Sequence, residues 1–509
     1  MDTSKTLRLI ALSASVMSLS APLYAFANTA TQNPASSTWT GTLPIAAHGP
    51  FQRVYMPQNA PSAANRDGFP REWTSAYANA RHNAAFPVGN DAPKWLRQGV
   101  GWNFAEARAW PLSDKIPFGN GVYGEREALP VQTQFMGNAL GVTAVDGTIY
   151  GESDDMFAYA VNARTGQLIW RTSPVQNNLM GDPVVAGRSV YLSAGSVSFN
   201  FAHVVKYAQT GKTSRGEDES FNGVISLNRN TGKFQWMFLT KGEAMPTPAY
   251  AHGKLYVSTG AGNIFAINAK DGKKIWKTHV GGIANMSDPA VYDGRVYVSM
   301  SVVPYIYCLN AKTGKVLWKQ GIKGAVNTGL GDVAPAVANG IVVQDTVVDK
   351  RVKNGHKTVN TTVQAMSAKT GKILWSHNMG RGPLPPAFKG GMPMIHGGVV
   401  YVGTPVNSVY QARNLKTGKL LWTWSVPDAG PAGAGRGAAT YYDGALYVST
   451  GPYVYALNSV TGTELGKHYV GGRFGIVNPT IVGGTIYLGN SWDWINALPV
   501  DAVNPHYKG

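Results

Sequence analysis

Short stretches of alternating apolar and polar residues fill most of the chain after residue 130. A typical stretch is GKLYVSTGAGNIFAINA, residues 253–269, in which two alternating runs are separated by a glycine-containing turn. Alternation with a period of two predicts strands with one buried face, and the turn between the runs predicts an antiparallel hairpin. The pattern therefore predicts an all-β protein.

A second motif follows each hairpin. Its seven copies are NARTGQLIW, LNRNTGKFQW, NAKDGKKIW, NAKTGKVLW, SAKTGKILW, NLKTGKLLW and the degenerate NSVTGTELG. The glycine in each copy supplies the positive φ of a tight turn, and the residues after it predict a further strand. Each unit thus contains four strands in about 40 to 47 residues, which is typical of a β-propeller blade.

An eighth unit, GGTIYLGNSWDWINALP, begins near the C-terminus and stops before its last strand. The segment KWLRQGVGWNFAEARAW, around Trp95, Trp102 and Trp110, is the candidate that completes this unit from the N-terminal side. Closure by both chain ends removes an open sheet edge. We therefore predict an eight-bladed β-propeller of four-stranded antiparallel blades over residues 91–509, with insertions at about 197–221 and 345–362. The tryptophans that end the repeats are expected to pack between blades: Trp170, Trp236, Trp276, Trp318, Trp375 and Trp422.

The N-terminal region does not follow the repeat. The stretch MDTSKTLR, with net positive charge, precedes an apolar run, LIALSASVMSLSAPLYA, and the small residues Ala25 and Ala27. This order predicts a secretory signal peptide at 1–27, since the run is shorter than the roughly 20 residues of a membrane span. An uncleaved anchor is the alternative. We expect an exported protein, in the periplasm or at the outer membrane or cell surface, whose residues 28–90 form an arm or loop layer.

Composition narrows the classes of partner. The chain carries 45 Lys and Arg against 28 Asp and Glu, a formal net charge of +17, and charged residues make up only 14% of it. Few carboxylates leave few ion pairs to lose in acid, and the cationic excess favours anionic partners. Nucleic acid is not expected, because the basic residues are scattered through turns. The one cysteine, Cys308, excludes an internal disulfide and is expected to be buried.

Aligning the blades on the residue that starts the second strand gives two columns of interest. The anchor residues are Tyr150, Tyr191, Tyr256, Tyr297, Val343, Tyr401, Tyr447 and Tyr487. Eleven positions earlier lies a column that we name the mouth ring: Ala139, Met180, Met245, Met286, Asp332, Gly390, Arg436 and Ile476. Nine positions before the anchor lies the second ring: Gly141, Asp182, Thr247, Asp288, Ala334, Met392, Ala438 and Asn478. Both columns precede the innermost strand of a blade, so we expect them to surround the mouth of a central channel.

Asp332 is the acid of the mouth ring, at a position where three sister blades carry methionine. Burial among methionines would raise the pKa of this carboxyl and let it deliver a proton, whereas pairing with Arg436 would lower the pKa. A catalytic role and a structural role therefore both remain open for Asp332. Asp182 and Asp288 each precede a proline and are expected first to bond backbone amides in a turn.

Three arginines flanked by glycine, Arg381, Arg436 and Arg473, lie in segments between successive blades. Glycine allows a ligand to approach the backbone closely, and guanidinium groups bind sulfonates and other oxyanions through forked hydrogen bonds. Met245 and Met286 of the mouth ring would offer soft apolar surface to a sulfur chain. The alternative is that the three arginines are separate surface residues.

The repeated AxLNAxTGKxLW pattern resembles the pyrroloquinoline-quinone-type propeller repeat over nearly all of residues 130–498. This repeat occurs both in quinoprotein dehydrogenases and in non-catalytic outer-membrane assembly scaffolds, so it specifies the fold more than the function. The resemblance to the dehydrogenases implies an adjacent Cys-Cys disulfide and a Ca²⁺ site of Glu, Asn and Asp, neither of which is found in this sequence. The resemblance to the scaffolds implies a lipid-anchored cysteine, and none lies near the signal.

The architecture of the whole chain, with the segment GLGDVAP around Asp332, resembles the tetrathionate hydrolases of acidophilic sulfur-oxidising bacteria. The resemblance implies an exported homodimeric enzyme, active in acid, that splits tetrathionate into thiosulfate, sulfate and sulfur without a redox cofactor. The family's essential Asp maps onto Asp332. No metal is expected, and peripheral association with the outer membrane is a further expectation.

Overall fold

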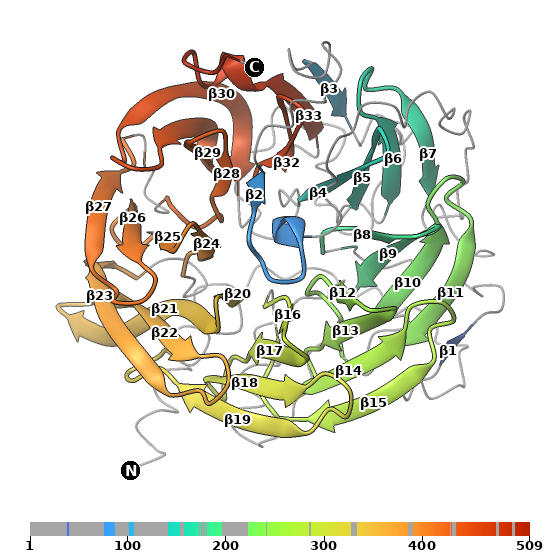
Figure 1. The fold of residues 1–509 in the computed structure, drawn as a ribbon, viewed down its shortest axis with the longest axis horizontal. Helices are drawn as coiled ribbons and strands as arrows, with labels where there is room; N and C mark the ends of the chain where they lie inside the picture. The colour runs from blue at the N-terminus through green and yellow to red at the C-terminus, as the bar shows by residue number, and fades with distance from the viewer. Residues whose placement is uncertain are drawn as a thin grey trace.

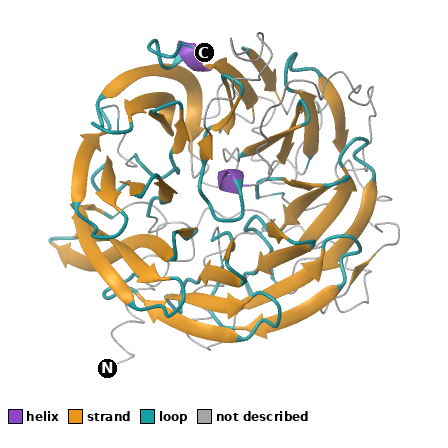
Figure 2. Ribbon diagram, viewed as in Figure 1, coloured by secondary structure: helices purple, strands orange, loops and turns teal. Residues whose placement is uncertain are grey.

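The computed structural model describes residues 38–39, 76–86, 101–105, 141–152, 157–172, 174, 179, 181–195, 222–240, 242–284, 287–326, 333–384, 390–427, 429, 434–474, 478–490 and 494–508. Strands account for nearly all the regular structure in these ranges, alongside two short 3₁₀ turns (Figure 2). The predicted signal peptide and the insertion at 197–221 lie outside the described residues.

Eight sheets are arranged in a ring around a central axis (Figure 1), which confirms the predicted eight-bladed β-propeller. Blades 1 to 4 comprise β4 (Val142–Val145), β5 (Thr148–Glu152), β6 (Ala158–Asn162) and β7 (Leu168–Thr172); β8 (Val184–Ala186), β9 (Ser189–Ala194), β10 (Gly223–Asn228) and β11 (Phe234–Leu239); β12 (Ala249–Ala251), β13 (Lys254–Ser258), β14 (Asn263–Asn268) and β15 (Lys274–His279); and β16 (Ala290–Tyr292), β17 (Arg295–Ser299), β18 (Tyr305–Asn310) and β19 (Val316–Gly321). In blade 2, β1 (Thr38–Trp39) adds a fifth strand against β11.

Blades 5 to 8 continue around the ring. They comprise β20 (Ala336–Ala338), β21 (Ile341–Lys353), β22 (His356–Ser367) and β23 (Ile373–Pro383); β24 (Met394–His396), β25 (Val399–Thr404), β26 (Val409–Asn414) and β27 (Leu420–Ser425); β28 (Thr440–Tyr442), β29 (Ala445–Asn458) and β30 (Glu464–Phe474); and β31 (Thr480–Val482), β32 (Thr485–Asn490) and β33 (Trp494–Pro499). In blade 7, β29 spans the stretch that forms two strands in the other blades. The short turn η9 (Val500–Ala502) follows the last blade.

Segments from the N-terminal and C-terminal parts of the chain together complete blade 8. β3 (Trp102–Ala105) pairs antiparallel with β33, Trp102 opposite Ala497, and thereby supplies the missing outer strand. This pairing confirms the predicted closure around Trp102. Contacts across the closing point continue inward, since the Thr480 hydroxyl donates to the carbonyl of Val142 (2.7 Å).

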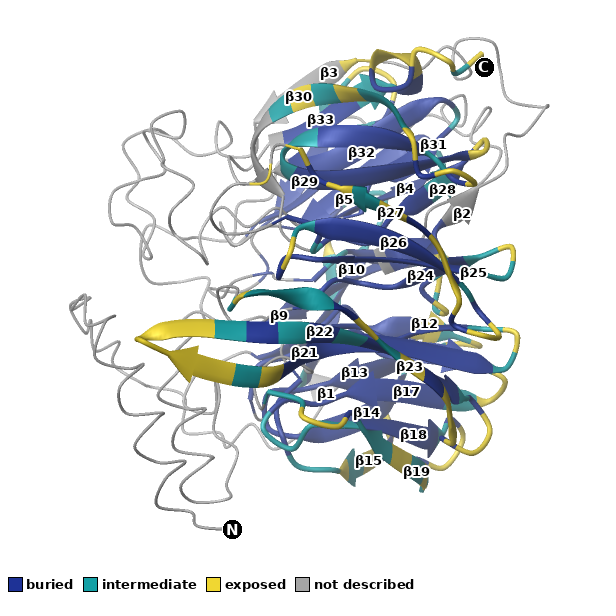
Figure 3. Ribbon diagram, turned by 90° about the vertical axis from the view of Figure 1, so that its left-hand side faces the viewer, coloured by how far each residue is buried: buried dark blue, intermediate teal, exposed yellow. Residues whose placement is uncertain are grey.

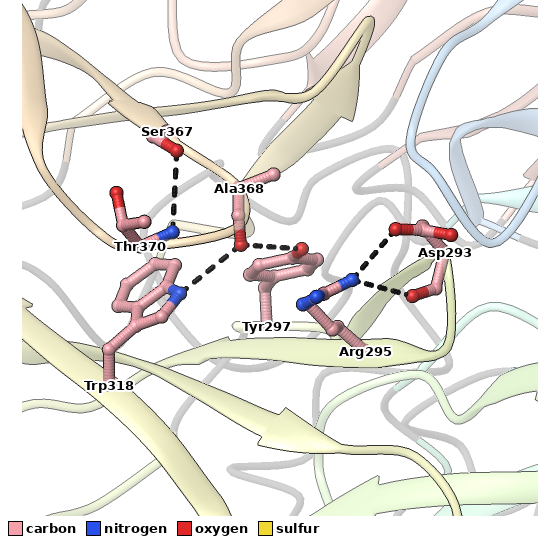
Figure 4. A network of polar contacts seen from close by, with 7 residues as sticks. All are labelled: Asp293, Arg295, Tyr297, Trp318, Ser367, Ala368 and Thr370. Atoms are coloured by element: carbon pink, nitrogen blue, oxygen red, sulfur yellow. Dashed lines mark hydrogen bonds and ion pairs between the residues drawn. The ribbon is translucent and has the colours of Figure 1, made fainter.

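The repeated motif docks each blade onto the next, as the sequence predicts. In blade 4 the indole N–H of Trp318 and the hydroxyl of Tyr297 both donate to the carbonyl of Ala368 in blade 5 (3.1 and 3.0 Å; Figure 4). A Cβ on Gly371 would lie 2.7 Å from the Trp318 ring, so the turn glycine allows the close approach as well as the positive φ of 73°. Trp170, Trp276, Trp375 and Trp422 donate to the next blade in the same way.

The insertion at 345–362 forms an extension of one hairpin. β21 and β22 continue past the ring as a ribbon that turns at Asn354 and Gly355, both with positive φ. Its tip is exposed, whereas the strands within the blades are largely buried (Figure 3). The core lies between successive blades, where Cys308 is fully buried as expected.

Candidate functional site

The innermost strands of successive blades contact one another around the axis, and the second ring immediately precedes them. Four consecutive blades join their second-ring residues by three hydrogen bonds. The backbone N–H of Gly141 donates to Asp182 Oδ1 (2.7 Å), that of Asp182 to Thr247 Oγ1 (2.8 Å), and that of Thr247 to Asp288 Oδ1 (2.7 Å). Asp182 and Asp288 therefore bond backbone amides of the preceding blade in the ring and hold blades together.

The opposite side of the second ring is apolar. The N–H of Ala334 faces the Sδ of Met392 (3.1 Å), and the N–H of Met392 donates to the carbonyl of Arg436 (3.1 Å). Ala334, Met392 and Ala438 are all buried and form one apolar cluster with Tyr77 and Val333. One side of the second ring is thus built from carboxyls and a hydroxyl, and the other from alkyl groups and a thioether.

Tyr77 belongs to a segment from the N-terminal region that reaches the centre of the ring. Residues 76–86, which we name the plug, begin with the 3₁₀ turn η3 (Ala76–Ala78) at the centre of the ring and end in β2 (Ala85–Phe86), parallel to β28 (Figure 1). The carbonyls of Ala80, Arg81 and Ala84 accept hydrogen bonds from the N–H groups of the innermost strands β16, β20 and β28 (2.6, 3.0 and 2.7 Å). The plug is therefore anchored to three blades.

Charged groups of the polar half act on Tyr77. Burial raises the pKa of its phenol well above the usual value; the charges of Asp288 and Asp182 raise it further, and that of Arg436 lowers it. Burial also raises the pKa of Asp182 to about 6, against one hydrogen bond from Gly141. The pKa of Asp288 is raised more strongly, by burial first and by Asp182 second. These groups carry protons under acid conditions in which an ordinary exposed carboxylate is already ionised.

Two further buried acids lie on the second strands, each two positions after the anchor of its blade. Glu152 Oε2 accepts from the N–H of Ser193 (3.2 Å), and Asp345 Oδ2 accepts from the N–H of Gly391 (3.0 Å). Burial raises the pKa of both carboxyls well above the usual values. Glu152 is in blade 1 and Asp345 is in blade 5, on the opposite side of the ring. Buried acids therefore lie on these second strands as well as in the second ring.

His82 belongs to the plug and contacts both the surrounding blades and Tyr77. Its Nδ1 lies 2.7 Å from the carbonyl oxygen of Pro335, and its ring centroid lies 4.8 Å from that of Tyr77. Burial lowers the pKa of this imidazole to about 4, against the opposing effect of hydrogen bonds to the carbonyls of Pro335 and Pro289. The ring is thus neutral at neutral pH and takes up a proton only in acid.

The structure describes only some of the residues that were predicted for the mouth ring. Asp332 and Met286 lie outside the described residues. Met245 is buried, 3% exposed. Arg436 is half-buried, and its backbone is fixed on both sides: the N–H of Gly435 donates to Thr450 Oγ1 (2.9 Å) and the carbonyl of Gly437 accepts from the Tyr410 hydroxyl (3.2 Å).

The other two predicted arginines lie on last strands. Arg381 is on β23, where its guanidinium donates to Thr358 Oγ1 (3.0 Å) and to the carbonyl of Asp349 (3.3 Å), both on the extended hairpin. Arg473 is on β30, one residue before the strand ends. Of the three, Arg436 is the one whose charge acts on Tyr77.

Sequence reasoning missed Tyr77, His82, Glu152 and Asp345. The last two had a visible signal, because the column two positions after the anchor is otherwise Ser or Gly: Ser193, Ser258, Ser299, Gly403, Ser449 and Gly489. Tyr77 and His82 had none, since the N-terminal region carries no repeat against which to align them. Within the described ranges, no group of three or more His, Cys, Asp or Glu side chains could hold a metal ion, and no helix is long and apolar enough to cross a membrane.

The fold and repeats define a propeller of the pyrroloquinoline-quinone repeat class. A family model described as outer membrane protein assembly factor BamB matches residues 132–285 and 283–434. The chain is similar to a solved quinohemoprotein alcohol dehydrogenase from Comamonas testosteroni, with a TM-score of 0.54 and 13% identity over 84% of this chain and 77% of that one. At this identity the likeness shows the fold alone.

Sequence relatives are much more similar. A protein named tetrathionate hydrolase from Acidithiobacillus ferrooxidans is 57% identical over 91% of this chain and 92% of its own length. Another of that name from Acidianus ambivalens is 38% identical over 89% of this chain and 88% of its own. The chain belongs to the tetrathionate hydrolase family.

Proposed function

We propose that this protein hydrolyses tetrathionate in acid. The observation that carries the proposal is the 57% identity to a tetrathionate hydrolase over 92% of that relative's length. In the balanced reaction, one tetrathionate dianion and one water give one thiosulfate, one sulfate, one sulfur atom and two protons. The reaction transfers no electrons to an acceptor, so it requires no redox cofactor.

Charge supports an anionic substrate. With 45 basic residues against 28 acidic ones, the chain becomes strongly cationic once its carboxylates are protonated. Tetrathionate remains a dianion under the same conditions, so acid increases the attraction between protein and substrate. Arg436 is half-buried beside the second ring, where a guanidinium can hold a sulfonate group through forked hydrogen bonds. Arg381, Arg473, Met245 and Met286 are the further proposed substrate contacts.

Asp332 is the proposed general acid. Cleavage of a sulfur–sulfur bond leaves negative charge on the departing sulfur, and a protonated carboxyl close to it can neutralise that charge in the transition state. The raised pKa values of the second-ring acids Asp182 and Asp288 support the view that buried carboxyls of this protein stay protonated in acid. We further propose that the enzyme is an exported homodimer, at the periplasm or cell surface.

The direct test is thiosulfate release from tetrathionate at about pH 3 and at neutral pH, without added quinone or metal. We expect release in acid that falls as the pH rises. Asp332→Asn should lower kcat by about 10²- to 10⁴-fold without unfolding the protein. The matched control is Asp293→Asn, at an exposed turn aspartate paired with Arg295 (2.7 Å), which should leave kcat unchanged.

Two outcomes would point elsewhere. No release in acid, together with dye reduction after addition of quinone and Ca²⁺, would favour a dehydrogenase. No release, together with specific capture of outer-membrane assembly factors, would favour a scaffold. Full activity in Asp332→Asn would leave the hydrolase but assign the proton to another group.

A further inference from the structure

The turns that follow the third strand carry lysines at the same two positions in four consecutive blades. In blades 3 to 6, one lysine stands two residues before the turn glycine and another directly after it. Among the described residues, only Lys273 of this set forms an ion pair, with Asp271 (3.4 Å). All eight side chains are exposed, and we name them the lysine face: Lys270, Lys273, Lys312, Lys315, Lys369, Lys372, Lys416 and Lys419.

Backbone hydrogen bonds place these turns on one side of the ring. In each of the four blades this turn bonds the turn after the first strand, as where the N–H of Ala311 donates to the carbonyl of Gly294 (2.9 Å). The indoles of Trp276, Trp318 and Trp375 donate to the carbonyl directly before the first lysine of the next blade. The turn between the second and third strands lies at the opposite end of an antiparallel blade, where the β21–β22 hairpin extends (Figure 3). The lysine face is therefore continuous across four blades, on the side away from that hairpin.

The turn itself does not require lysine. In blade 7 the N–H of Val460 donates to Asn458 Oδ1 (2.9 Å), so the turn closes without a lysine. The N–H of Lys312 makes the same bond with Asn310 Oδ1 in blade 4 (2.9 Å). Because like charges on one face repel one another, the repeated lysines indicate a binding surface rather than a need of the turn.

Exposed aliphatic side chains accompany the lysines. Two residues after the second lysine of each turn, blades 3 to 6 carry apolar residues that are 43% to 50% exposed: Ile275, Leu317, Leu374 and Leu421. The equivalent residue is buried in blade 1 (Ile169, 4%) and packs against the core in blade 7 (Leu465). The exposed aliphatic residues thus occur in the same four blades as the lysine pairs. A bilayer surface offers anionic groups beside hydrocarbon, whereas a soluble polyanion offers charge alone.

Acid conditions select phosphate as the anionic group. Lysine keeps its charge in acid, whereas carboxylates lose theirs, so a partner that depended on carboxylates would no longer be anionic. A phosphodiester stays ionised. A second copy of this chain would meet the lysine face with like charge, since the net charge is +17 even at pH 7. The inference takes only the acid medium from the proposed function.

We propose that the lysine face is a docking surface for a lipid bilayer that carries anionic phosphate groups. The lysines bind the phosphates, and the exposed aliphatic side chains contact the boundary between headgroups and hydrocarbon. Along an innermost strand such as β20, the turn at 339–340 follows the strand, whereas the second-ring residue Ala334 precedes it. Docking therefore leaves the second-ring end of the blades directed away from the bilayer.

The test is cosedimentation of the protein with phosphatidylglycerol vesicles at about pH 3, with phosphatidylcholine vesicles as the neutral reference. The turn variant combines four substitutions: Lys312→Gln, Lys315→Gln, Lys369→Gln and Lys372→Gln. It should bind at least about tenfold more weakly, since each lysine near an anionic surface contributes about fivefold. The control variant removes the same charge from exposed residues outside the lysine face: Lys323→Gln, Arg351→Gln, Lys353→Gln and Lys357→Gln. It should change binding by less than about threefold, because charges more than a Debye length from the surface are screened.

A second pair of changes separates a bilayer from a soluble polyanion. Leu317→Gln with Leu374→Gln should weaken vesicle binding by about threefold or more and leave the binding of soluble polyphosphate unchanged. Binding of polyphosphate without binding of vesicles would overturn the assignment to lipid, and so would unchanged vesicle binding in this leucine variant.

The lysine face itself is judged by the charge variants. No binding of the wild type to phosphatidylglycerol vesicles, or equal losses in the turn variant and its control, would overturn the docking surface. Thermal melting shows whether each variant is folded; should the turn variant not fold, Lys312→Gln with Lys315→Gln is compared with Lys353→Gln with Lys357→Gln. The assay contains no tetrathionate, so its failure leaves the hydrolase proposal intact, and loss of the hydrolase proposal leaves this assay valid.

Discussion

The two halves of the second ring share one backbone position but differ in chemistry. In blades 2 to 4 the ring carries Asp182, Thr247 and Asp288, each accepting a hydrogen bond from the backbone of its neighbour. In blades 5 to 7 the corresponding residues are Ala334, Met392 and Ala438, which share one apolar cluster with Tyr77. The repeat thus fixes the position of the second-ring residue in each blade, whereas the type of residue at this position differs from blade to blade. The polar half is neutral only when protonated, so it is suited to acid.

The largest expected effect comes from placing an acid in the apolar half. Ala438 is buried, and the nearby N–H of Met392 already donates to Arg436. The new carboxylate of Ala438→Asp would therefore lack this donor, and at neutral pH it should lower the free energy of unfolding by more than about 3 kcal/mol. Chemical denaturation at pH 7 and pH 3 measures this effect.

Met392→Asp sharpens the same comparison. Its carboxylate would meet the N–H of Ala334, which now faces the Met392 sulfur, just as Asp182 meets that of Gly141. Met392→Asp should therefore destabilise less than Ala438→Asp, and both should recover stability in acid. Equal losses in the two variants at both pH values would contradict the assigned role of the backbone donors.

The next largest expected effect is the pH dependence of the stability that the polar half of the second ring contributes. The folded protein binds a proton at Asp182 up to about pH 6, whereas the unfolded chain releases it near 3.8. The folded state therefore binds more protons between these values, and its stability falls as the pH rises through them. The difference between these two pKa values corresponds to at most on the order of 3 kcal/mol of unfolding free energy from Asp182. Asp288 adds to this effect with the same sign.

Asp182→Asn should flatten this profile, as measured by denaturation midpoints from pH 3 to pH 7. His82 acts in the opposite direction, because its folded pKa of about 4 lies below the ordinary 6.5 and its contribution is lost as the pH falls. His82→Gln should therefore steepen the profile that Asp182→Asn flattens. A wild-type protein more stable at pH 7 than at pH 4 would refute the role given to the buried acids.

The smallest effect concerns the link between the two aspartates. Thr247→Val keeps the shape of the side chain but leaves the N–H of Asp182 without its acceptor. The expected loss is about 1 to 2 kcal/mol of unfolding free energy. The control Thr417→Val, in an exposed turn, should cost less than about 0.5 kcal/mol. Differential scanning calorimetry distinguishes the two.

The fold could be predicted because the same turn-and-strand motif occurs seven times in the sequence. The glycine of each turn and the tryptophan after it are local signals, and the contact that Trp318 makes is repeated by Trp170, Trp276, Trp375 and Trp422. The closure of blade 8 was also predictable, since an incomplete last unit requires a strand from elsewhere. The alignment further gave the second ring, whose hydrogen bonds the structure then showed.

The candidate site was predictable only as far as the repeat reaches. Alignment placed Arg436 beside the axis, but it gave no information about residues 76–86, which have no counterpart in any blade. The position of Tyr77 depends on contacts with strands more than 200 residues away, such as β20 and β28. Alignment also placed Arg381 with Arg436, whereas its guanidinium contacts lie on the β21–β22 hairpin.

The pairing of β3 with β33 joins residues 102–105 to residues 494–497. A ribosome therefore has almost the whole polypeptide to make before this seam can form. Until then, the unpaired strand edges of the early blades are exposed to other unfinished chains. Contacts between segments so far apart in the sequence also form slowly. We therefore expect association of unfinished chains to compete with closure of the ring during synthesis.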